Sequence, residues 1–483
     1  MEDKRIDVYH THIEVYPYTK GEFFELEKTL SRWDQISKTY GRYRPIAYHI
    51  ENGVLYIPKG INIEVLESRF GCKATINSKA AKPMKMSSEY QVKIDPRSEV
   101  QRKSISFLTG TDEYYSRSGY CQYCLNLETS GGKTYCAISA MAKLGVKTLI
   151  FVNREILVHH WKQEIMKFTD IPDEKIMLID TEAISRILEY ELDADVYIVM
   201  HQTVQAFAKN NSWNDIKEFM SIAGIGIKIY DEAHEFMSSI FTIDCNTNVA
   251  KTFYLTATLG RSNRQENKCL NIMLSASAKF NDSDEVKRKH IHYHPIIFQS
   301  AIPLKLIALM KTGHGFSSYK YVVAALKYDI KHQYLNAIKY CIEESAGREG
   351  QILIVTPMKD AVRLIEEYVE SLACARHASV GTIFSDNPEE VNLDNQHCDI
   401  IISTIKSCGT GFNPPNLQTI ICGEPHTSRI MTHQLKGRLD RFKGDATYFY
   451  DLIDKSIPFM DNVESAHQKE LEPMCAEVAP IYI

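Results

Sequence analysis

The sequence predicts an α/β protein in which two parallel-sheet units follow a smaller amino-terminal α+β domain. The main observation is a series of short, continuously apolar runs from about Leu149 onward, which alternate with longer amphipathic segments. Such runs are typical of strands buried on both faces of a parallel sheet. The second observation is size, because 483 residues with 44% hydrophobic content exceed what one core comfortably serves.

The individual elements can be assigned in order. Two segments carry apolar residues at spacings of three or four, as surface helices do: NREILVHHWKQEIMKF (153–168) and KDAVRLIEEYVESL (359–372). The predicted strands are TLIFV (148–152), VYIVM (196–200), IGIKIY (225–230), TFYLT (252–256), ILIVT (352–356), DIIIST (399–404) and TIIC (419–422).

The domain boundaries follow from changes in pattern. The polar stretch FNDSDEVKRKH, residues 280–290, separates the two α/β sets, and the beginning of the chain has isolated strand-like pieces without βα alternation. We therefore predict domains at residues 1–90, 91–285 and 286–465, with 466–483 as a carboxy-terminal tail.

Composition narrows the functional class. The net charge of -5 argues against a protein coated in positive charge, although a local basic groove is compatible with it. The 12 scattered cysteines and the absence of a signal-like start favour free thiols in a reducing compartment. The apolar runs fall far short of the roughly 20 residues that a membrane helix needs. The expectation is a soluble intracellular protein without membrane contact.

The stretch LNLETSGGKTYCAI, residues 125–138, has the parts of a phosphate-binding loop. Such a loop needs successive backbone N–H groups, a Lys for the β and γ phosphates, and a Ser/Thr hydroxyl for Mg²⁺. Leu127 replaces the glycine that usually opens the loop, and an ordinary helix N-terminus is the alternative. The candidate nucleotide-binding residues are Ser130, Gly131, Gly132, Lys133 and Thr134.

A second signal comes about a hundred residues later, in IGIKIYDEAH. This apolar strand ends in the tetrad Asp231, Glu232, Ala233, His234. A carboxylate at a strand end holds Mg²⁺, and the adjacent Glu can orient or deprotonate the attacking water. Asp231 and Thr134 are therefore the predicted Mg²⁺ ligands, and Glu232 is the predicted catalytic carboxylate.

Further motifs follow in order. LTATL contains Thr256, Ala257 and Thr258, STIKSCGTGFNPPNL spans 403–417, and HQLKGRLDR has the pattern Q-x-x-G-R-x-x-R. With these motifs, the chain from about Asp95 to Asp454 resembles the superfamily 2 helicases with a D-E-A-H tetrad. The resemblance implies two tandem RecA-like P-loop NTPase lobes, with 256–258 coupling the ATP site to the nucleic-acid site.

The last motif has a physical reason for its spacing. On a helix, Gln434, Arg438 and Arg441 stand at i, i+4 and i+7, which points them at one target. Two guanidinium groups facing the γ-phosphate from the second lobe would offset transition-state charge only when the lobes close. A basic helix face that makes surface ion pairs is the alternative.

The resemblance also implies contacts outside the catalytic centre. Gln101, in DPRSEVQRKSI, matches a position that reads the adenine edge, and Gly411 and Asn413 match the second lobe's nucleotide contact, with Asn413 where many relatives carry Asp. The nucleic-acid candidates in the two lobes contact the backbone, which implies little sequence preference. These candidates are Arg154, Gln202, Thr203 and Thr404.

The amino-terminal domain has its own basic segment. Residues 31–90 contain ten basic side chains against five acidic ones. Within them, KTYGRYRP mixes basic side chains, which suit phosphate contact, with tyrosines, which suit base stacking. A solvated loop is the alternative, but the resemblance implies a small DNA-binding domain at this place. The candidates are Lys38, Tyr40, Arg42, Tyr43 and Arg44.

Two metal sites can be considered from spacing. Cys121 and Cys124 have ligand spacing but no second pair at finger distance, and His290, His292 and His294 would share one face of a strand. We favour a structural interpretation of both, with the histidines on an exposed strand of the second lobe.

The sequence as a whole predicts an ATP- and Mg²⁺-dependent DNA helicase or translocase. The motif variants resemble phage branch-remodelling helicases of the UvsW type and XPB-like DNA translocases, which implies branched or forked DNA in replication, recombination or repair. We expect a monomer in the cytoplasm or nucleoid, or in the host cytoplasm if the source is a phage. The rivals are an RNA-directed or transcript-releasing ATPase and a non-hydrolysing nucleotide-dependent clamp.

Overall fold

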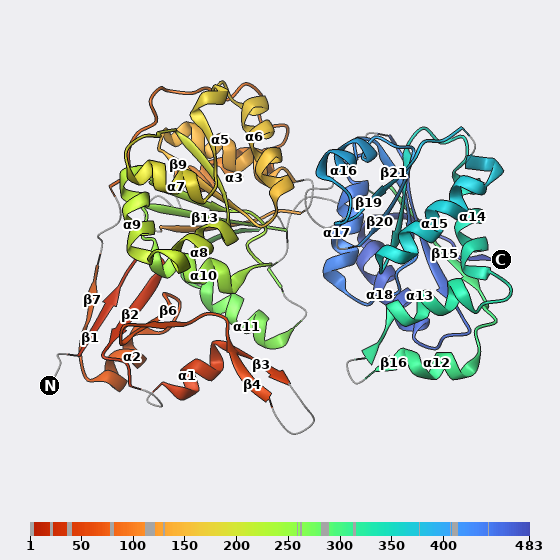
Figure 1. Ribbon diagram of the computed structural model, residues 1–483, viewed down its shortest axis with the longest axis horizontal. Coiled ribbons are helices and arrows are strands. Elements are labelled where there is room, and N and C mark those ends of the chain that lie inside the picture. Colours follow the sequence, from red (N-terminus) through yellow and green to blue (C-terminus); the bar gives the residue numbers. More distant parts are fainter. Residues whose placement is uncertain are drawn as a thin grey trace. The chain divides into compact units, whose positions relative to one another are not determined.

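The computed structural model divides into two compact units, Met1–Ser283 and Asp284–Ile483 (Figure 1). The residues that it describes are 4–19, 23–35, 41–77, 82–111, 121–128, 131–257, 259–260, 263–281, 289–312, 315–375, 377–405, 407, 414–442 and 444–483.

A parallel sheet forms the centre of the first unit. Its strand order is β10-β11-β9-β12-β13-β8-β14, and neighbouring strands run parallel. The inner strands are rich in apolar residues because helices cover both faces. The strands are β8 (Gln122–Asn126), β9 (Thr148–Val152), β10 (Ile176–Ile179), β11 (Val196–Met200), β12 (Ile227–Tyr230), β13 (Lys251–Thr256) and β14 (Ala278–Asn281).

Helices cover this sheet in two layers (Figure 1). One layer consists of α3, α5 and α6, whose apolar side chains share one core with that face of the sheet. The opposite layer consists of α7 to α10 and shares a second core. The helices of this unit's sheet are α3 (Glu99–Thr109), α5 (Lys133–Leu144), α6 (Glu155–Phe168), α7 (Thr181–Leu188), α8 (His201–Asn210), α9 (Trp213–Ile222), α10 (Met237–Asn246) and α11 (Arg264–Met273).

The amino-terminal residues form a small α+β domain within the same unit. Its mixed sheet has the order β5-β6-β2-β1-β7, and a separate antiparallel hairpin is made by β3 and β4. The elements are β1 (Arg5–Val8), β2 (His12–Tyr16), α1 (Phe24–Thr29), β3 (Ser31–Gln35), β4 (Gly41–Pro45), β5 (His49–Glu51), β6 (Val54–Pro58), α2 (Ile63–Phe70) and β7 (Ala74–Ile76).

This domain shares a core with the α7–α10 layer. Ile6 and Val15 of its sheet belong to the same apolar cluster as Phe241 of α10 and Leu270 of α11. The two parts therefore bury apolar surface against each other, and that burial stabilises both.

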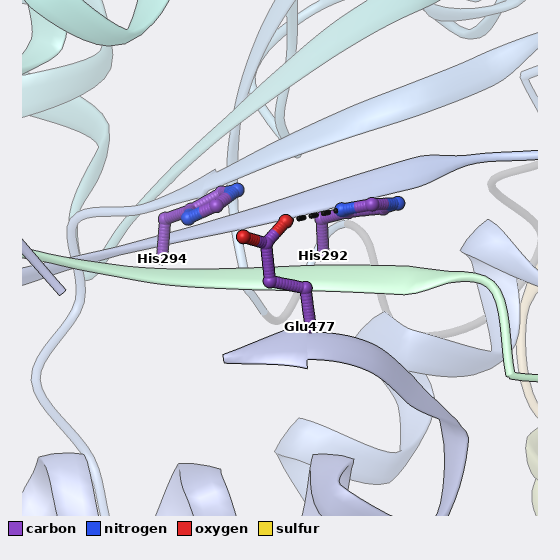
Figure 2. A group of neighbouring side chains, drawn as sticks. All are labelled: His292, His294 and Glu477. Carbon is purple, nitrogen blue, oxygen red and sulfur yellow. Dashed lines mark hydrogen bonds and ion pairs between the residues drawn. The ribbon is translucent and has the colours of Figure 1, made fainter. Parts of the chain in front are cut away.

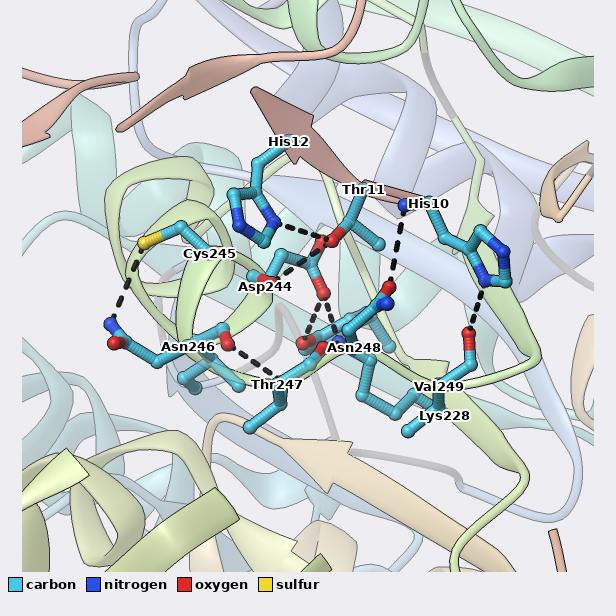
Figure 3. Close-up of polar contacts among 12 residues, drawn as sticks. His10, Thr11, His12, Lys228, Asp244, Cys245, Asn246, Thr247, Asn248 and Val249 are labelled. Atoms are coloured by element: carbon cyan, nitrogen blue, oxygen red, sulfur yellow. Dashed lines mark hydrogen bonds and ion pairs between the residues drawn. The ribbon is translucent and has the colours of Figure 1, made fainter. Parts of the chain in front are cut away.

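Polar contacts around Asp244 of α10 reinforce this junction (Figure 3). The Asp244 carboxylate accepts hydrogen bonds from the Tyr230 hydroxyl at 2.8 Å and the Tyr254 hydroxyl at 2.6 Å, and it pairs with the Lys228 ammonium. The Thr11 hydroxyl, from the turn between β1 and β2, donates to the Asp244 carbonyl at 2.9 Å. Burial lowers the pKa of Lys228, and the charge of Asp244 opposes that shift.

A second parallel sheet forms the centre of the second unit. Its order is β19-β20-β18-β21-β22-β15-β23, and β24 also pairs with β15. Neighbouring strands run parallel. The strands are β15 (Ile291–Phe298), β18 (Gln351–Thr356), β19 (Val380–Ile383), β20 (Ile400–Thr404), β21 (Leu417–Cys422), β22 (Thr447–Asp454), β23 (Cys475–Val478) and β24 (Ile481–Tyr482).

Helices also cover both faces of this second sheet. The core on one face includes side chains of α13, α14 and α15, and the core on the other includes side chains of α17. The helices are α12 (Leu304–Met310), α13 (Ser318–Lys327), α14 (Gln333–Ser345), α15 (Lys359–Ser371), α16 (Glu389–Asn395), α17 (Arg429–Leu439) and α18 (Met460–Leu471); a short hairpin joins β16 (Lys311–Thr312) to β17 (Gly315–Phe316).

These two helix-covered parallel sheets and the small first domain confirm the predicted α/β class with two RecA-like lobes. Residues 466–483, predicted as a tail, instead finish α18 and add β23 and β24 to the second sheet, where both pair with β15. In the described part of the chain, every helix is too short or too polar to span a bilayer.

Candidate functional site

The candidate site of the first lobe lies where parallel strands end together. β11, β9, β12, β13 and β8 are consecutive neighbours in the sheet and run in one direction. Their carboxyl ends therefore share one edge, which is where open α/β sheets bind ligands. The phosphate loop follows β8, and the tetrad beginning with Asp231 follows β12.

The phosphate loop leads directly into α5. Gly132 is the N-cap residue, with a φ of 85°, a left-handed conformation that glycine adopts without strain. Lys133 is 9% exposed, and its Nζ donates to the carbonyls of Leu127 at 3.2 Å and Glu128 at 3.4 Å. Thr134 is half-buried in the first helical turn. The helix N-terminus and Lys133 together favour a bound phosphate group; Ser130 lies outside the described residues.

Leu127 does not obstruct this loop. Its side chain is buried in the α5 face of the lobe, and its backbone N–H donates to the Thr256 carbonyl at 3.2 Å. The residue therefore continues the pairing of β8 with β13. A turn begins after it, where the Gly131 N–H donates to the Glu128 carbonyl at 3.0 Å.

Gln101 of α3 contacts the phosphate loop itself. Its amide Nε2 donates to the Gly131 carbonyl at 3.2 Å, and its Oε1 accepts from the Arg97 backbone N–H at 3.0 Å. A Cβ on Gly132 would lie 2.2 Å from that Nε2, so a larger residue there would displace the end of the Gln101 side chain from the loop. The side chain predicted to read an adenine edge thus supports the loop in this structure.

Backbone geometry and burial determine the position and the protonation of the tetrad carboxylates. Asp231 Oδ1 accepts from the Glu232 N–H at 3.0 Å, and Glu232 has a φ of 45°, in the left-handed region. Burial raises the pKa of the Asp231 carboxyl, and the nearby Glu232 raises it further; a hydrogen bond from Trp161 and the charge of Lys133 offset part of this rise. The predicted Mg²⁺ ligand and the predicted phosphate-binding Lys are thus electrostatic neighbours.

Trp161 is a site residue that motif spacing missed. Its Nε1 donates to Asp231 Oδ2 at 2.9 Å from α6, and its side chain is fully buried. The only sequence signal is a tryptophan on the apolar face of the helix after β9, which is equally typical of a core residue.

His234 connects the tetrad to the predicted coupling segment. Its Nδ1 lies 2.9 Å from the Thr256 hydroxyl at the end of β13 and 3.4 Å from Glu232 Oε2. One imidazole thus joins the ends of β12 and β13. Ala257 follows Thr256 and is half-buried, and Thr258 lies outside the described residues.

The nucleic-acid candidates of this lobe also follow strand ends. Arg154 is the N-cap residue of α6, after β9, and Gln202 and Thr203 begin α8, after β11. The Gln202 amide donates to the Asn153 carbonyl at 3.4 Å, which links the two strand ends. Arg154 and Thr203 are half-buried and Gln202 is exposed, so all three present some surface on the sheet edge.

The second lobe holds its candidates on β20 and α17. The Thr404 hydroxyl accepts from the Ser407 N–H at 3.2 Å at the end of β20. Gln434 is half-buried and Arg438 is 4% exposed on α17, whereas the helix ends at Leu439, so Arg441 lies in the following turn. The predicted helical spacing of all three is therefore wrong for Arg441. Gly411 and Asn413 lie outside the described residues.

Helix α17 is anchored to α18 by one carboxylate. Glu470 accepts from Arg429 Nε at 2.8 Å, lies 3.2 Å from His433 Nδ1, and accepts from Lys436 Nζ at 3.0 Å. Burial raises the pKa of Glu470, but these hydrogen bonds and positive charges outweigh it and lower the pKa to about 2. Three residues on the face of α17 toward α18 thus fix the helix that carries Arg438.

The β3–β4 hairpin carries the described candidates of the first domain. Arg42 and Arg44 are exposed, and the Tyr43 ring lies 4.8 Å from the ring of Trp33, which is itself 45% exposed. A Cβ on Gly41 would lie 2.4 Å from the Trp33 ring, so glycine permits this packing. Trp33 was missed by sequence reasoning. Lys38 and Tyr40 lie outside the described residues.

The two cysteine and histidine patterns are placed as follows. Cys124 is buried within β8, and Cys121 precedes the strand. His290 is 3% exposed, and its Nε2 lies 3.2 Å from Asp440 Oδ1 at the end of α17. His292 and His294 share a face of β15 and stack at 6.3 Å between ring centroids.

Comparisons with known proteins identify several to which this chain is similar. Residues 89–261 match the family described as type III restriction enzyme, res subunit. The "Putative helicase 161L" of Invertebrate iridescent virus 6 is 23% identical over 342 residues, which cover 68% of this chain and 71% of that protein. Transcript termination protein OPG145 of Variola virus is 24% identical over 355 residues, covering 70% of this chain and 65% of that protein.

A solved structure, the crystal structure of T4 UvsW, aligns over 100% of this chain and 99% of that one, with 16% identity and a TM-score of 0.36. The family match covers the phosphate loop, the Asp231 tetrad and Thr256. The two viral relatives are named a putative helicase and a transcript termination protein, and each is similar to this chain over about two thirds of its length.

Proposed function

We propose that the protein is an ATP-dependent DNA helicase or translocase that remodels branched or forked DNA. The observation that carries the proposal is the shared sheet edge, where Lys133 and Gly132 lie at the start of α5 and Asp231 lies at the end of β12. The positive end of α5 and the buried Lys133 ammonium suit the phosphates of a nucleotide. The Asp231 carboxylate, whose ionised form the charge of Lys133 favours, suits the divalent ion that accompanies them.

The donor set fits Mg²⁺, because a carboxylate and a hydroxyl are oxygen ligands of the kind that it prefers. Asp231 and Thr134 would hold the ion, which neutralises charge on the phosphates when bound. Lys133 binds the same phosphates from the helix side. Glu232 orients the attacking water and accepts its proton, and the neighbouring His234 ties this step to Thr256.

The second lobe supplies Arg438, Arg441 and Gln434 to the γ-phosphate in this proposal. The anchoring of α17 by Glu470 supports it, because a guanidinium must be held in place to stabilise transition-state charge. Cycles of nucleotide binding and hydrolysis would then alternate the grip of Arg154, Gln202, Thr203 and Thr404 on the nucleic-acid backbone.

The choice of DNA rests on the first domain. The β3–β4 hairpin exposes Arg42 and Arg44 for phosphates and Trp33 for stacking, which suits a junction of duplex and single strand. A second candidate is a transcript-releasing ATPase, because the Variola virus relative is named a transcript termination protein.

The decisive experiment measures ATP turnover with no polymer, single-stranded DNA, duplex, forked DNA and RNA. We expect the largest stimulation with forked DNA. Glu232→Gln is expected to abolish turnover while retaining ATP, and Lys133→Ala is expected to bind ATP poorly. Preferential stimulation by RNA would favour the transcript-releasing candidate. DNA binding that requires ATP but is accompanied by no ATP turnover in the wild type would indicate a nucleotide-dependent clamp.

A further inference from the structure

We propose that His292, His294 and Glu477 bind a divalent transition-metal ion on the second lobe (Figure 2). One ligand atom from each side chain lies within 4.8 Å of the others. Two imidazoles and a carboxylate are a donor set suited to Zn²⁺ and its neighbours in the first transition row. The proposal is independent of the nucleotide site.

The sheet register brings the three side chains together. His292 and His294 are two residues apart on β15 and so point to the same face. Glu477 on β23 is the register partner of His292. The donors therefore come from two adjacent strands whose spacing is fixed by backbone pairing.

A hydrogen bond to the backbone orients the His294 ring and determines which of its nitrogens carries the proton. Its Nδ1 lies 2.9 Å from the Ala479 carbonyl. A carbonyl oxygen only accepts, so Nδ1 carries the proton and Nε2 keeps a free lone pair. Metal-binding histidines are commonly held by such a bond from their other nitrogen.

His292 is held by the third member of the cluster. Its Nδ1 lies 2.9 Å from Glu477 Oε2, so the two groups share a proton that a metal ion can replace. The rings are also pre-oriented, because Tyr448 of β22 stacks on His292 at 5.2 Å and on His294 at 6.4 Å between centroids. The Arg348 guanidinium lies 3.4 Å from the Tyr448 ring centroid, and its charge limits the affinity for a cation.

The cluster is open enough for an ion to enter. The His292 and Glu477 side chains are 27% and 52% exposed. Water can therefore complete the coordination shell that three protein ligands leave open. Because Glu477 lies on β23 and the histidines on β15, a bound ion would fasten β23 to its neighbour in the sheet.

The test uses the full chain, freed of metal with a chelator and titrated with Zn²⁺ against a chromophoric competitor. The chain also contains 12 cysteines, whose thiols can take up zinc, so the informative quantity is the difference from each variant. We expect His294→Ala to lose one equivalent of bound Zn²⁺ and Glu477→Gln to weaken that equivalent by about tenfold or more. His377→Ala, an exposed histidine of the same lobe, is the matched control.

Hydrogen exchange gives a second readout. At Zn²⁺ ten times above the wild-type Kd, exchange of the β23 amides is expected to slow by about tenfold in the wild type and in His377→Ala, but by about twofold or less in Glu477→Gln. Equal zinc stoichiometry and equal protection in Glu477→Gln and the wild type would overturn the proposal. This outcome decides the question even if His294→Ala fails to fold.

Discussion

At the scale of single residues, the hydrogen bond from Trp161 to Asp231 is the contact with the clearest chemical consequence. Burial and Glu232 both raise the pKa of the Asp231 carboxyl, whereas the indole N–H favours its ionised form. A carboxylate must be ionised to hold Mg²⁺, so Trp161 opposes the protonation that burial promotes.

Trp161→Phe should therefore raise the Mg²⁺ concentration for half-maximal ATP turnover by about tenfold, since hydrogen bonds to charged groups contribute about 1.5–3 kcal/mol. The pKa of Asp231 rises further in this variant, so activity present at neutral pH is lost at a higher pH as the solution is acidified. The measurement is a Mg²⁺ titration of turnover across pH. Trp213→Phe in α9 is the control, and identical titrations for both variants would contradict the role of the indole.

Glu232 provides a second prediction, from its φ of 45°. A left-handed conformation costs a non-glycine residue about 1–2 kcal/mol. Glu232→Gly and Glu232→Ala should both abolish turnover because they remove the carboxylate. The glycine variant should nevertheless be more stable than the alanine variant by roughly 1 kcal/mol, measured by calorimetry. Equal melting temperatures would show that the strain is absent in solution.

At the scale of elements, α17 depends on Glu470 for its position. The folded-state pKa of Glu470, about 2, is below that of an ordinary carboxyl group. Its contribution to stability is therefore complete above the ordinary carboxyl pKa and is lost as the pH falls toward about 2.

Glu470→Gln should accelerate hydrogen exchange of the α17 amides by about tenfold at pH 7, because the helix loses a charged acceptor of hydrogen bonds. The ratio of variant to wild type, measured at the same pH, should fall toward one in acid. Glu472→Gln, an exposed neighbour, serves as the control. A ratio that does not change with pH would exclude the ion pairs as the cause.

Substitutions in the β3–β4 hairpin test the proposed phosphate contacts and the proposed base stacking separately. Replacing Arg42 and Arg44 with Gln should flatten the log–log salt dependence of duplex binding by up to about 0.9 for each phosphate group that is no longer neutralised. Trp33→Ala should instead weaken single-strand binding by about 1–3 kcal/mol without changing the salt slope. Lys73→Gln, an exposed lysine of the same domain, is the control. Unchanged binding in both hairpin variants would assign the hairpin to folding.

Elements differ in how well the sequence predicted them. TLIFV and VYIVM coincide with β9 and β11, because strands buried on both faces consist of unbroken apolar runs. β10 and β19 have four residues each, too few for a pattern to stand out. The end of α17 before Arg441 depends on backbone geometry after Leu439, which side-chain spacing does not encode.

Residues of the candidate site also differ in whether the sequence could identify them. Lys133 and Asp231 could be named because their motifs are local in sequence. Trp161 could not, since it is 70 residues from its partner Asp231 and an indole on an apolar helix face is typical of the core. The support that Gln101 gives to Gly131 also depends on how α3 packs beside the loop.

At the scale of the whole first unit, the amino-terminal domain shares its core with the lobe that carries the phosphate loop. A chain beginning at residue 88 would expose the apolar side chains of α10 and α11 that Ile6 and Val15 now help to cover. We expect this shortened chain to melt at a lower temperature and to bind a hydrophobic dye, because it lacks part of a shared core. Melting equal to that of the full chain would show that the lobe folds without this domain.

The hydrogen bond between Thr11 and Asp244 also bears on how the protein is made. The two residues are 233 positions apart in the chain. At about 5–20 residues per second, a ribosome needs roughly 10 to 50 seconds to add α10 after the β1–β2 turn has been synthesised. During that interval the first strands lack their partner surface. The rate of translation across the intervening segment is therefore expected to influence how much newly made protein escapes aggregation.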